Sequence, residues 1–272
     1  MYKICRILLA LTLGLCLFAV GSSASGVTVQ VKGSPLSGAF LEDGTTWVPL
    51  RKFCESRGST VGWDSATQSI TVTDKNFKAR IILGDRLVEA DGRSFWLSAA
   101  PVCREGVTYV PVRGLAKLYG FTVGWDDKTQ TVSLTGGKAF ADAGQFYDQD
   151  ALYWLSHIIF AESGDEPLEG QVAVGNVVMN RVASSNYPDT IWGVIFDTKY
   201  GVQFTPTKSG SIYKEPSEES VLAAKLVLEG AEVVPDNAVY FISSKVSDSN
   251  WIKRTCQKLA VIGDHTFFAD PA

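Results

Sequence analysis

The hydrophobic positions of the chain change their spacing near residue 137. Before that point, short stretches alternate apolar and polar residues, which is typical of half-buried strands. After it, apolar residues recur at steps of three and four, which is typical of amphipathic helices. The pattern predicts an α+β protein of two domains. The first would be β-rich with short helices, and the second mainly helical with a small β element.

The first domain contains an internal repeat. The segment GTTWVPLRKFCESRGSTVGWDSATQSITVT begins at Gly44, and GVTYVPVRGLAKLYGFTVGWDDKTQTVSLT begins at Gly106, an offset of 62 residues. Such self-similarity indicates one structural unit used twice. Each copy predicts a strand, a helix and a hairpin. Pro49 and Pro111 suit the start of the helix, and glycines 58 and 120 suit its C-terminal cap.

Apolar spacing in each copy also predicts a buried helix face. Leu50, Phe53 and Cys54 share one face of the first helix. Cys54 occupies the position that Ala116 fills in the second copy, so it is predicted to be a small buried thiol. The hairpin that follows each helix is expected to turn at Asp64 or at the equivalent residue 126.

Residues 137–149 are rich in glycine and alanine and lack periodicity, so they are predicted to be a linker. The second domain, residues 150–272, opens with DALYWLSHIIFAE. Its Leu152, Leu155, Ile159 and Glu162 fall on one helix face. The apolar face of this helix is therefore predicted to end with the carboxyl group of Glu162.

A carboxyl group in such a place is desolvated, so its pKa should rise and it should hold a proton near neutral pH. This is the property that a general acid needs for glycoside cleavage. Glu166 directly precedes Pro167, where the pattern predicts a second helix. A negative charge there favours the helix N-terminus, so Glu166 is predicted to be mainly structural.

The remaining pattern predicts several more elements in the second domain. Asn176 and Asn180 lie four residues apart on the second helix, where they would face either the cleft or water. The segment PSEESVLAAKLVLEG predicts a helix that ends at Gly230. NAVYFIS predicts a strand, and LAVIGDHTFF predicts another that is broken at Gly263.

Composition supports a globular protein with no nucleic-acid partner. Hydrophobic residues make up 46% of the 272 residues, charged residues make up 20%, and the net charge is −4. No basic run indicates a phosphate-binding surface. Beyond the first 24 residues the cysteines are Cys54, Cys103 and Cys256, an odd number without metal-ligand spacing, so we predict no metal and no cofactor.

The first 24 residues have the order of a secretory signal. Lys3 and Arg6 precede a 14-residue apolar run, ILLALTLGLCLFAV, and small residues lead to Ala24. A retained membrane anchor is the alternative, but the run is shorter than the roughly 20 residues that a spanning helix needs. We therefore expect a secreted protein with no membrane contact after cleavage.

Residues 27–136 resemble the copper amine oxidase N-terminal-like stalk domain, through the repeated G-x-T-x-V-P-x-R and G-x-T-V-G-W-D-x-x-T-Q motifs. The resemblance does not imply copper chemistry, since both histidines of the chain lie outside this region. Tryptophans 47, 63, 96 and 125 would form either a sugar-stacking platform or part of the core. The latter is the prediction for all four, because buried aromatic side chains contribute strongly to a small core.

Residues 151–269 resemble the catalytic domain of the SleB-type cell wall hydrolases, the spore cortex-lytic family. The resemblance rests on AESGDEPLEGQVAVGNVVMNRV, YPDTIWGVI, QFTP, NAVYF and IGDHTFF, although ESGDEP replaces the more common EARGEP. It implies a lysozyme-like, lytic-transglycosylase-type fold with one catalytic glutamate, matched by Glu162. Gln203, Phe204 and His265 match other motif positions and are expected to bind substrate, together with Asn180.

These observations predict an exported enzyme that cuts the glycan backbone of peptidoglycan in the cell wall or spore cortex of a Gram-positive bacterium. A lytic transglycosylase would use Glu162 alone. A muramidase would usually need a second carboxylate about 5–9 Å away, for which Asp165, Glu166, Asp189 and Asp264 are candidates. The alternative function is a non-catalytic wall-binding protein. It is less compatible with an acid on an apolar helix face.

Overall fold

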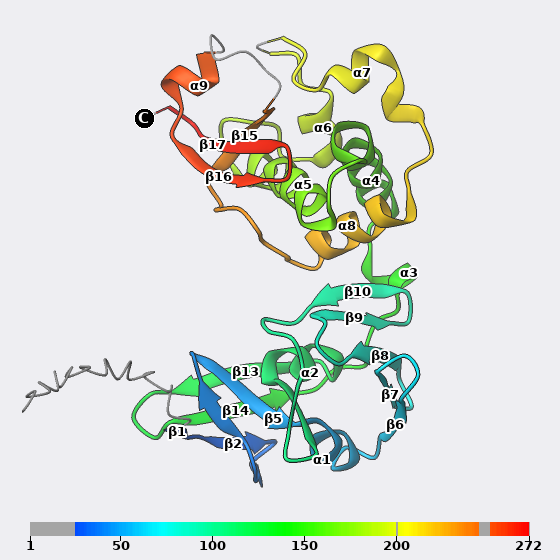
Figure 1. The fold of residues 1–272 in the computed structure, drawn as a ribbon, viewed down its shortest axis with the longest axis vertical. Coiled ribbons are helices and arrows are strands. Elements are labelled where there is room, and N and C mark those ends of the chain that lie inside the picture. The colour runs from blue at the N-terminus through cyan, green and yellow to red at the C-terminus, as the bar shows by residue number, and fades with distance from the viewer. Residues whose placement is uncertain (1–24, 200, 245–250, 272) are drawn as a thin grey trace, which may run out of the picture.

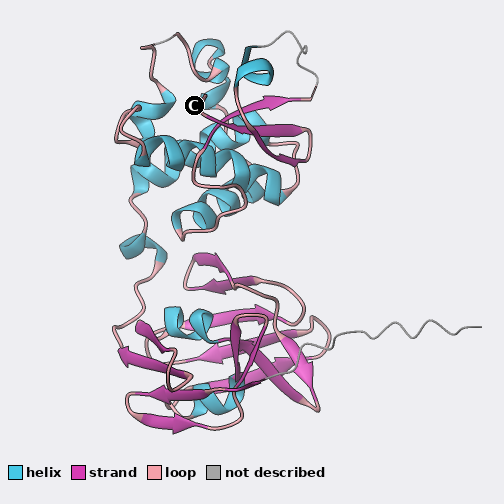
Figure 2. Cartoon of the chain, turned by 90° about the vertical axis from the view of Figure 1, so that its left-hand side faces the viewer, coloured by secondary structure: helices cyan, strands magenta, loops and turns pink. Residues whose placement is uncertain are grey.

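The computed structural model describes residues 25–199, 201–244 and 251–271. The chain forms two domains arranged end to end, with strands dominating the first and helices the second (Figures 1 and 2). The α+β architecture predicted from the hydrophobic pattern is therefore confirmed. The predicted signal segment, residues 1–24, lies outside the described residues.

The first domain is built from three sheets. Their strand orders are β1-β4-β5-β12-β11, β10-β9-β8-β7-β6 and β13-β14-β2-β3, and only the β14–β2 pair is parallel among the described strands. The elements are β1 (Ser25–Gly26), β2 (Thr28–Val31), β3 (Ser34–Leu36), β4 (Phe40–Glu42), β5 (Thr45–Pro49), α1 (Leu50–Glu55), β6 (Thr60–Asp64), β7 (Ser69–Thr73), β8 (Lys78–Ile82), β9 (Leu87–Ala90), β10 (Arg93–Trp96), β11 (Val102–Arg104), β12 (Val107–Pro111), α2 (Val112–Leu118), β13 (Phe121–Asp126) and β14 (Thr131–Gly136).

The two sequence repeats fold as predicted. The first is β5-α1-β6-β7 and the second is β12-α2-β13-β14. Gly58 and Gly120 follow the helices with φ of 83° and 62°, in the left-handed region that glycine adopts without strain. Asp64 accepts a hydrogen bond from the Ala66 amide in the first hairpin turn, and Asp126 accepts one from the Lys128 amide in the second.

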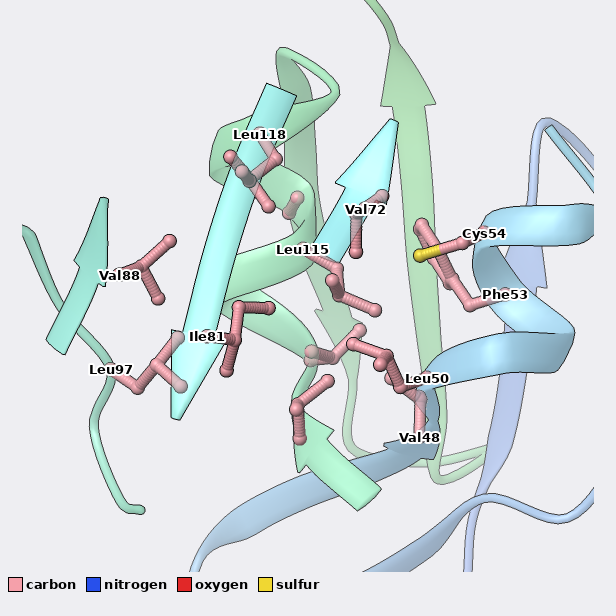
Figure 3. Close-up of a cluster of buried hydrophobic side chains, with 14 of the residues drawn as sticks. Val48, Leu50, Phe53, Cys54, Val72, Ile81, Val88, Leu97, Leu115 and Leu118 are labelled. Carbon is pink, nitrogen blue, oxygen red and sulfur yellow. The ribbon is translucent and has the colours of Figure 1, made fainter. Parts of the chain in front are cut away.

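One hydrophobic core holds the first domain together. Figure 3 shows side chains from both repeats meeting in it, including Leu50 and Phe53 of α1 and Leu115 of α2. Cys54 is fully buried there, as predicted, and burial raises the pKa of its thiol to about 11. The cysteines of the described residues are all free, and among them Cys103 is exposed.

The tryptophans of the first domain do not share one environment. Trp47 is only 7% exposed and stacks on Phe40, as expected of a core residue. Trp63 and Trp125 are 47% and 45% exposed, so the expectation that they are buried is wrong. Each lies on an edge strand of its sheet, one residue before the aspartate that begins the hairpin turn, so no further strand lies beside it.

The second domain packs its longest helices against one another and against a three-stranded sheet, β15-β17-β16. The strand predicted to break at Gly263 is instead a hairpin of two strands, because Gly263 turns the chain with a positive φ of 57°. The elements are α4 (Gln149–Ser163), α5 (Leu168–Ala183), α6 (Ile191–Ile195), α7 (Thr205–Ser209), the 3₁₀ helix η1 (Ser211–Tyr213), α8 (Glu218–Leu228), β15 (Ala238–Ser243), α9 (Trp251–Thr255), β16 (Lys258–Ile262) and β17 (His265–Ala269).

The segment between the domains is packed. Residues 137–149 contain a short helix, α3 (Ala143–Phe146), and the side chains of Phe140 and Tyr147 are buried. The Arg93 guanidinium lies 4.3 Å from the ring centre of Phe140 and 3.5 Å from that of Phe146. The predicted linker is therefore part of the contact between the domains.

A buried ion-pair network joins the two domains. Glu229, at the C-terminal end of α8, accepts two hydrogen bonds from Arg93 at 2.6 and 3.0 Å. Its carboxylate also lies 2.7 Å from the ammonium of Lys117. Because the carboxylate has two cationic partners and the side chain is almost fully buried, it is fixed at this junction and ties α8 to β10 and α2.

Candidate active site

Helix α4 positions Glu162. The helix begins where the Asp148 carboxylate accepts a hydrogen bond from the Ala151 amide, and it ends at Gly164. Leu155, Ile158 and Ile159 are fully buried on the face that packs against α5 and α8. Glu162 follows in the last turn, partly buried, at the point where this packed face meets the surface.

Burial gives Glu162 the property of an acid that is protonated near neutrality. Desolvation raises the pKa of its carboxyl group to about 7, and the nearby positive charge of Arg181 only partly opposes this rise. The rise in the pKa of Glu162 that helix periodicity predicts is therefore found in the structure. At neutral pH the group is divided between its acid and base forms, which is what a proton-transfer catalyst requires.

Glu162 lies where two hollows in the surface meet. The larger, of about 690 Å³, extends from Glu162 past Arg181, Tyr187, Gln203 and Tyr240. The smaller, of about 420 Å³, is lined by α4 residues, Lys214, the β16–β17 turn and Glu162 itself. A linear substrate that occupied both hollows would pass directly over the Glu162 carboxyl group.

Arg181 is a site residue that the sequence analysis missed. Its guanidinium is 4% exposed and lies over the rings of Tyr187, Phe204 and Tyr240 at 5.2, 5.1 and 5.6 Å. Its Nε donates to the Val239 carbonyl, whereas its Nη1 has no hydrogen-bond partner among the described residues. Burial lowers the pKa of Arg181 from its ordinary value, but an arginine remains charged at neutral pH.

Helix spacing would have identified Arg181. It follows Val174, Val177 and Val178 at the three- and four-residue steps that mark the buried face of α5. This is the same argument that selects Glu162 on α4. A charged side chain on such a face is rarely buried unless it is paired with another group, so its position marks it for attention.

The smaller hollow contains a second polar group, formed by Glu166 and the β16–β17 turn. The Glu166 carboxylate accepts a hydrogen bond from the Asp264 amide at 2.9 Å, and its Oε1 lies 3.5 Å from Nδ1 of His265. A Cβ atom at Gly263 would lie 1.7 Å from Oε2 of Glu166, so only glycine fits against this carboxylate. Glu166 therefore holds the hairpin against the start of α5. This contact is structural, but it differs from the stabilisation of the helix N-terminus on which the sequence prediction rested.

The structure brings three of the four predicted substrate-binding residues to the two hollows. Gln203 and Phe204 line the larger hollow, where Phe204 is buried and contributes to its floor. His265 lines the smaller one, and burial lowers the pKa of its imidazole. Asn180 does not reach either hollow. Its amide donates to the carbonyls of Pro235 and Ala238, because this side of α5 faces the chain leading into β15.

The four candidates for a second carboxylate do not all lie near Glu162. Asp165, Glu166 and Asp264 line the smaller hollow together with Glu162. Asp189 lies outside both hollows, in the exposed turn before α6. Within residues 25–199, 201–244 and 251–271, no group of three His, Cys, Asp or Glu side chains is arranged to hold a metal ion. No helix in this described part is long and apolar enough to cross a membrane.

Comparison with known families agrees with this division into domains. Residues 165–268 match the family described as Cell Wall Hydrolase, and residues 27–134 match the Copper amine oxidase N-terminal domain. The second domain is a cell wall hydrolase domain. Glu162 lies just before the matched range of this domain, so its assignment depends on the geometry described above.

Individual relatives of the chain are spore cortex-lytic enzymes. It is 34% identical over 133 residues to that of Oceanobacillus iheyensis and 35% identical over 121 residues to that of Bacillus cereus. These alignments cover 49% and 44% of this chain and 46% and 45% of the relatives, so the chain spans about half the length of the curated relatives it matches. The solved catalytic domain of the germination-specific lytic transglycosylase SleB from Bacillus anthracis is 33% identical. Its alignment covers 96% of that domain and 45% of this chain, with a TM-score of 0.41.

Proposed function

We propose that the cell wall hydrolase domain cleaves the glycan backbone of peptidoglycan, between N-acetylmuramic acid and N-acetylglucosamine, with Glu162 as the catalytic acid and base. The observation that carries this proposal is a carboxyl group, with its pKa raised to about 7, at the meeting point of two hollows. The named relatives, which are spore cortex-lytic enzymes, support the choice of substrate.

The proposed reaction needs a single carboxyl group. Protonated Glu162 donates its proton to the bridging oxygen as the bond from that oxygen to the muramyl C1 breaks. The resulting carboxylate then removes the proton from the muramyl 6-hydroxyl while O6 bonds to C1. This step closes a 1,6-anhydro ring and restores the acid form of Glu162, with no water consumed.

Arg181 is proposed to assist from the larger hollow. Its buried positive charge lies close enough to Glu162 to favour the carboxylate form, which the first proton transfer produces. Its Nη1 is buried and has no hydrogen-bond partner among the described residues, so the assistance proposed for Arg181 is electrostatic. Gln203, Phe204 and His265 are proposed to contact the glycan on either side of the scissile bond.

A hydrolytic outcome requires a water molecule and a second carboxylate. Asp165, Glu166 and Asp264 line the same hollow as Glu162, but Glu166 already binds the Asp264 amide. A hydrolase would have to use Asp165 or Asp264. We propose transglycosylation as the main reaction because it needs only the carboxyl group of Glu162. The site of action is proposed to be the cell wall or the spore envelope, which the protein reaches by secretion.

Mass analysis of digested peptidoglycan tests the reaction. Purified vegetative and cortex peptidoglycan are incubated with the full chain, and the released fragments are examined for their terminal residues. Anhydromuramyl ends, which are one water lighter than reducing ends, are the expected product. Reducing ends would show hydrolysis instead, and binding without any released fragment would show a non-catalytic wall-binding protein.

Glu162→Gln tests the assigned residue. The amide preserves the shape of the side chain but has no proton to transfer, so fragment release should fall by at least about 10²-fold. Asp189→Asn, which changes an exposed carboxylate outside both hollows, is the matched control and should retain full activity. A folded Glu162→Gln variant with unchanged activity would exclude Glu162 as the acid.

A further inference from the structure

The two repeats of the first domain are related by a local two-fold axis. Strands β5 and β12 pair antiparallel, with Val48 opposite Val110. These two residues occupy equivalent positions in the two repeats, 62 residues apart. Trp47 pairs with Pro111 and Pro49 with Tyr109, so a local two-fold axis passes through the Val48–Val110 pair. Any site that one repeat forms with the paired strand of the other must therefore occur twice.

Two hollows follow this symmetry. The first, of about 800 Å³, combines Pro49, Arg51 and Trp63 of the first repeat with residues 106–108 of the second. The other, of about 410 Å³, combines Pro111, Arg113 and Trp125 of the second repeat with residues 44–46 of the first. The residues named here correspond at the offset of 62, so the two hollows occupy equivalent places in the repeats, with the first about twice as large.

Each hollow is walled by an exposed indole. Trp63 lies directly opposite Ile70 in the β6–β7 hairpin, and Trp125 lies opposite Val132 in the β13–β14 hairpin. Opposed residues of an antiparallel pair project to the same face, and Ile70 and Val132 both belong to the core. Each indole is therefore anchored beside a core side chain, while about half of its surface remains open to the hollow.

The chemistry of the hollows suits a sugar polymer that carries carboxylates. The open indole faces are flat and apolar and match the C–H face of a pyranose ring. In a chain of net charge −4, each hollow nevertheless has one more basic than acidic side chain in its lining. The equivalent basic side chains are Arg51 and Arg113, and a guanidinium group is suited to bind carboxylates of the kind that peptidoglycan carries on its muramyl peptides. Arg51 pairs with Glu55 at 3.3 Å, and a ligand carboxylate would compete with this weak, exposed ion pair.

We propose that these hollows are a pair of peptidoglycan-binding sites, in which Trp63 and Trp125 each stack on a sugar ring of the glycan strand. The choice of ligand rests on the function proposed for the second domain. Two equivalent sites on one rigid domain fit a polymer of repeating units, because linked sites bind more tightly together than either does alone. The first domain would thus hold the wall while the second domain cuts it.

Sedimentation with insoluble, teichoic-acid-free peptidoglycan tests the proposal. The full chain carrying Glu162→Gln, which does not digest its ligand, is compared with the same chain carrying Trp63→Ala, Trp125→Ala or both. Each single change should weaken binding by about tenfold or more through loss of avidity, and the double change should weaken it further. Trp63→Tyr should retain much of the binding, since a phenol ring also offers a stacking face.

Trp192→Ala is the matched control, because Trp192 is an exposed indole that lies on α6 of the second domain. It should bind the wall as the parent chain does. The proposal would be overturned if the folded double variant sedimented with peptidoglycan as fully as the parent chain does. It would also be overturned if the parent chain bound only to walls that carry teichoic acid or to wall proteins. This result is separable from the proposed cleavage. If the parent chain cuts soluble fragments while the double tryptophan variant binds the wall normally, the proposed cleavage stands and only the proposed binding sites are excluded.

Discussion

The two domains differ in where they place their ionisable side chains. In the second domain, ionisable groups are drawn inward, with Arg181 and His265 buried and Glu162 partly so. In the first domain, the interior is apolar apart from small hydroxyl groups and Arg93 at the junction. Both domains expose aromatic side chains, among them Trp63 and Trp125 in the first and Trp192 and Trp251 in the second. Trp63 and Trp125 differ from the others because they occupy equivalent positions of the repeat, each lining a hollow.

This difference matters because buried ionisable groups and exposed indoles are suited to different tasks. A buried acid or base is costly to keep charged, so its pKa shifts and it becomes able to transfer protons. An exposed indole keeps a large apolar face in water, which favours contact with another apolar surface. On the functions proposed above, Glu162 would cleave the glycan in the second domain, and the paired indoles of the first domain would contact the wall. The following predictions test each side of this division.

The largest effect on stability is expected where the domains meet. Glu229→Ala removes the shared partner of Arg93 and Lys117, and leaves the buried guanidinium of Arg93 without its carboxylate. Removing one partner of a buried ion pair costs about 3–5 kcal/mol. Urea unfolding should show this loss. The control Glu89→Ala breaks the exposed Arg80–Glu89 pair and should change stability by no more than about 1 kcal/mol. Equal effects of the two changes would mean that the domains do not support each other.

Trp47 and Trp125 should differ sharply in their contribution to folding. Trp47 is buried against Phe40, and Trp47→Ala should destabilise the chain by about 3–5 kcal/mol. Trp125 is half exposed, so Trp125→Ala should cost about 1 kcal/mol or less. Thermal melting of both variants provides the measurement. A large loss from Trp125→Ala would identify it as a core residue and weaken its assignment to the wall.

Glu162 should make stability depend on pH. Burial raises its pKa from about 4.5 to about 7, so the folded chain binds one more proton than the unfolded chain between these values. The stability contributed by the protonated group is complete at pH 4 and is lost as the pH rises through 7. The neutral Glu162→Gln variant should therefore match the parent at pH 4 and exceed it by about 3 kcal/mol at pH 8.

Two measurements extend this prediction. Cleavage by the parent chain should decline above about pH 7, because the acid form of Glu162 is then depleted. Glu169→Gln, an exposed carboxyl group at the start of α5, should change stability by less than about 0.5 kcal/mol at either pH. A pH-independent difference between Glu162→Gln and the parent would show that the carboxyl group is not desolvated.

The smallest effect is expected at Glu166. In Glu166→Gln the amide oxygen still accepts the hydrogen bond from the Asp264 amide, but without the negative charge that strengthens it. We expect a loss of about 1 kcal/mol in stability and a cleavage rate close to that of the parent. If this variant is folded and inactive while Glu162→Gln is active, the roles of the two carboxylates are reversed.

Much of the molecule follows from local pattern. The repeat predicts strand, helix and hairpin in both copies because alternation, prolines and glycines act within a few residues. Cys54 and Glu162 were placed correctly for the same reason, since helix periodicity determines which side chains share the buried face. Arg181 was also within reach of this argument.

Other features depend on segments that are distant in the sequence. Asn180 shares α5 with Arg181, yet it binds the carbonyls of Pro235 and Ala238 because the chain before β15 happens to cross its side of the helix. Residues 137–149 have the composition of a linker, but Arg93 and Glu229 draw them into the contact between domains. No pattern within either segment encodes the partner.

Local pattern alone specifies the α+β class with two domains, the repeat, the buried helix faces and an acid on one of them. The tertiary structure decided which groups share a site: Glu162 with Arg181 at the meeting of two hollows, and Trp63 with the strand of the other repeat. The physical reason is that periodicity specifies the face that an element buries, which is a local property. The residues opposite that face are chosen by packing among elements far apart in the chain.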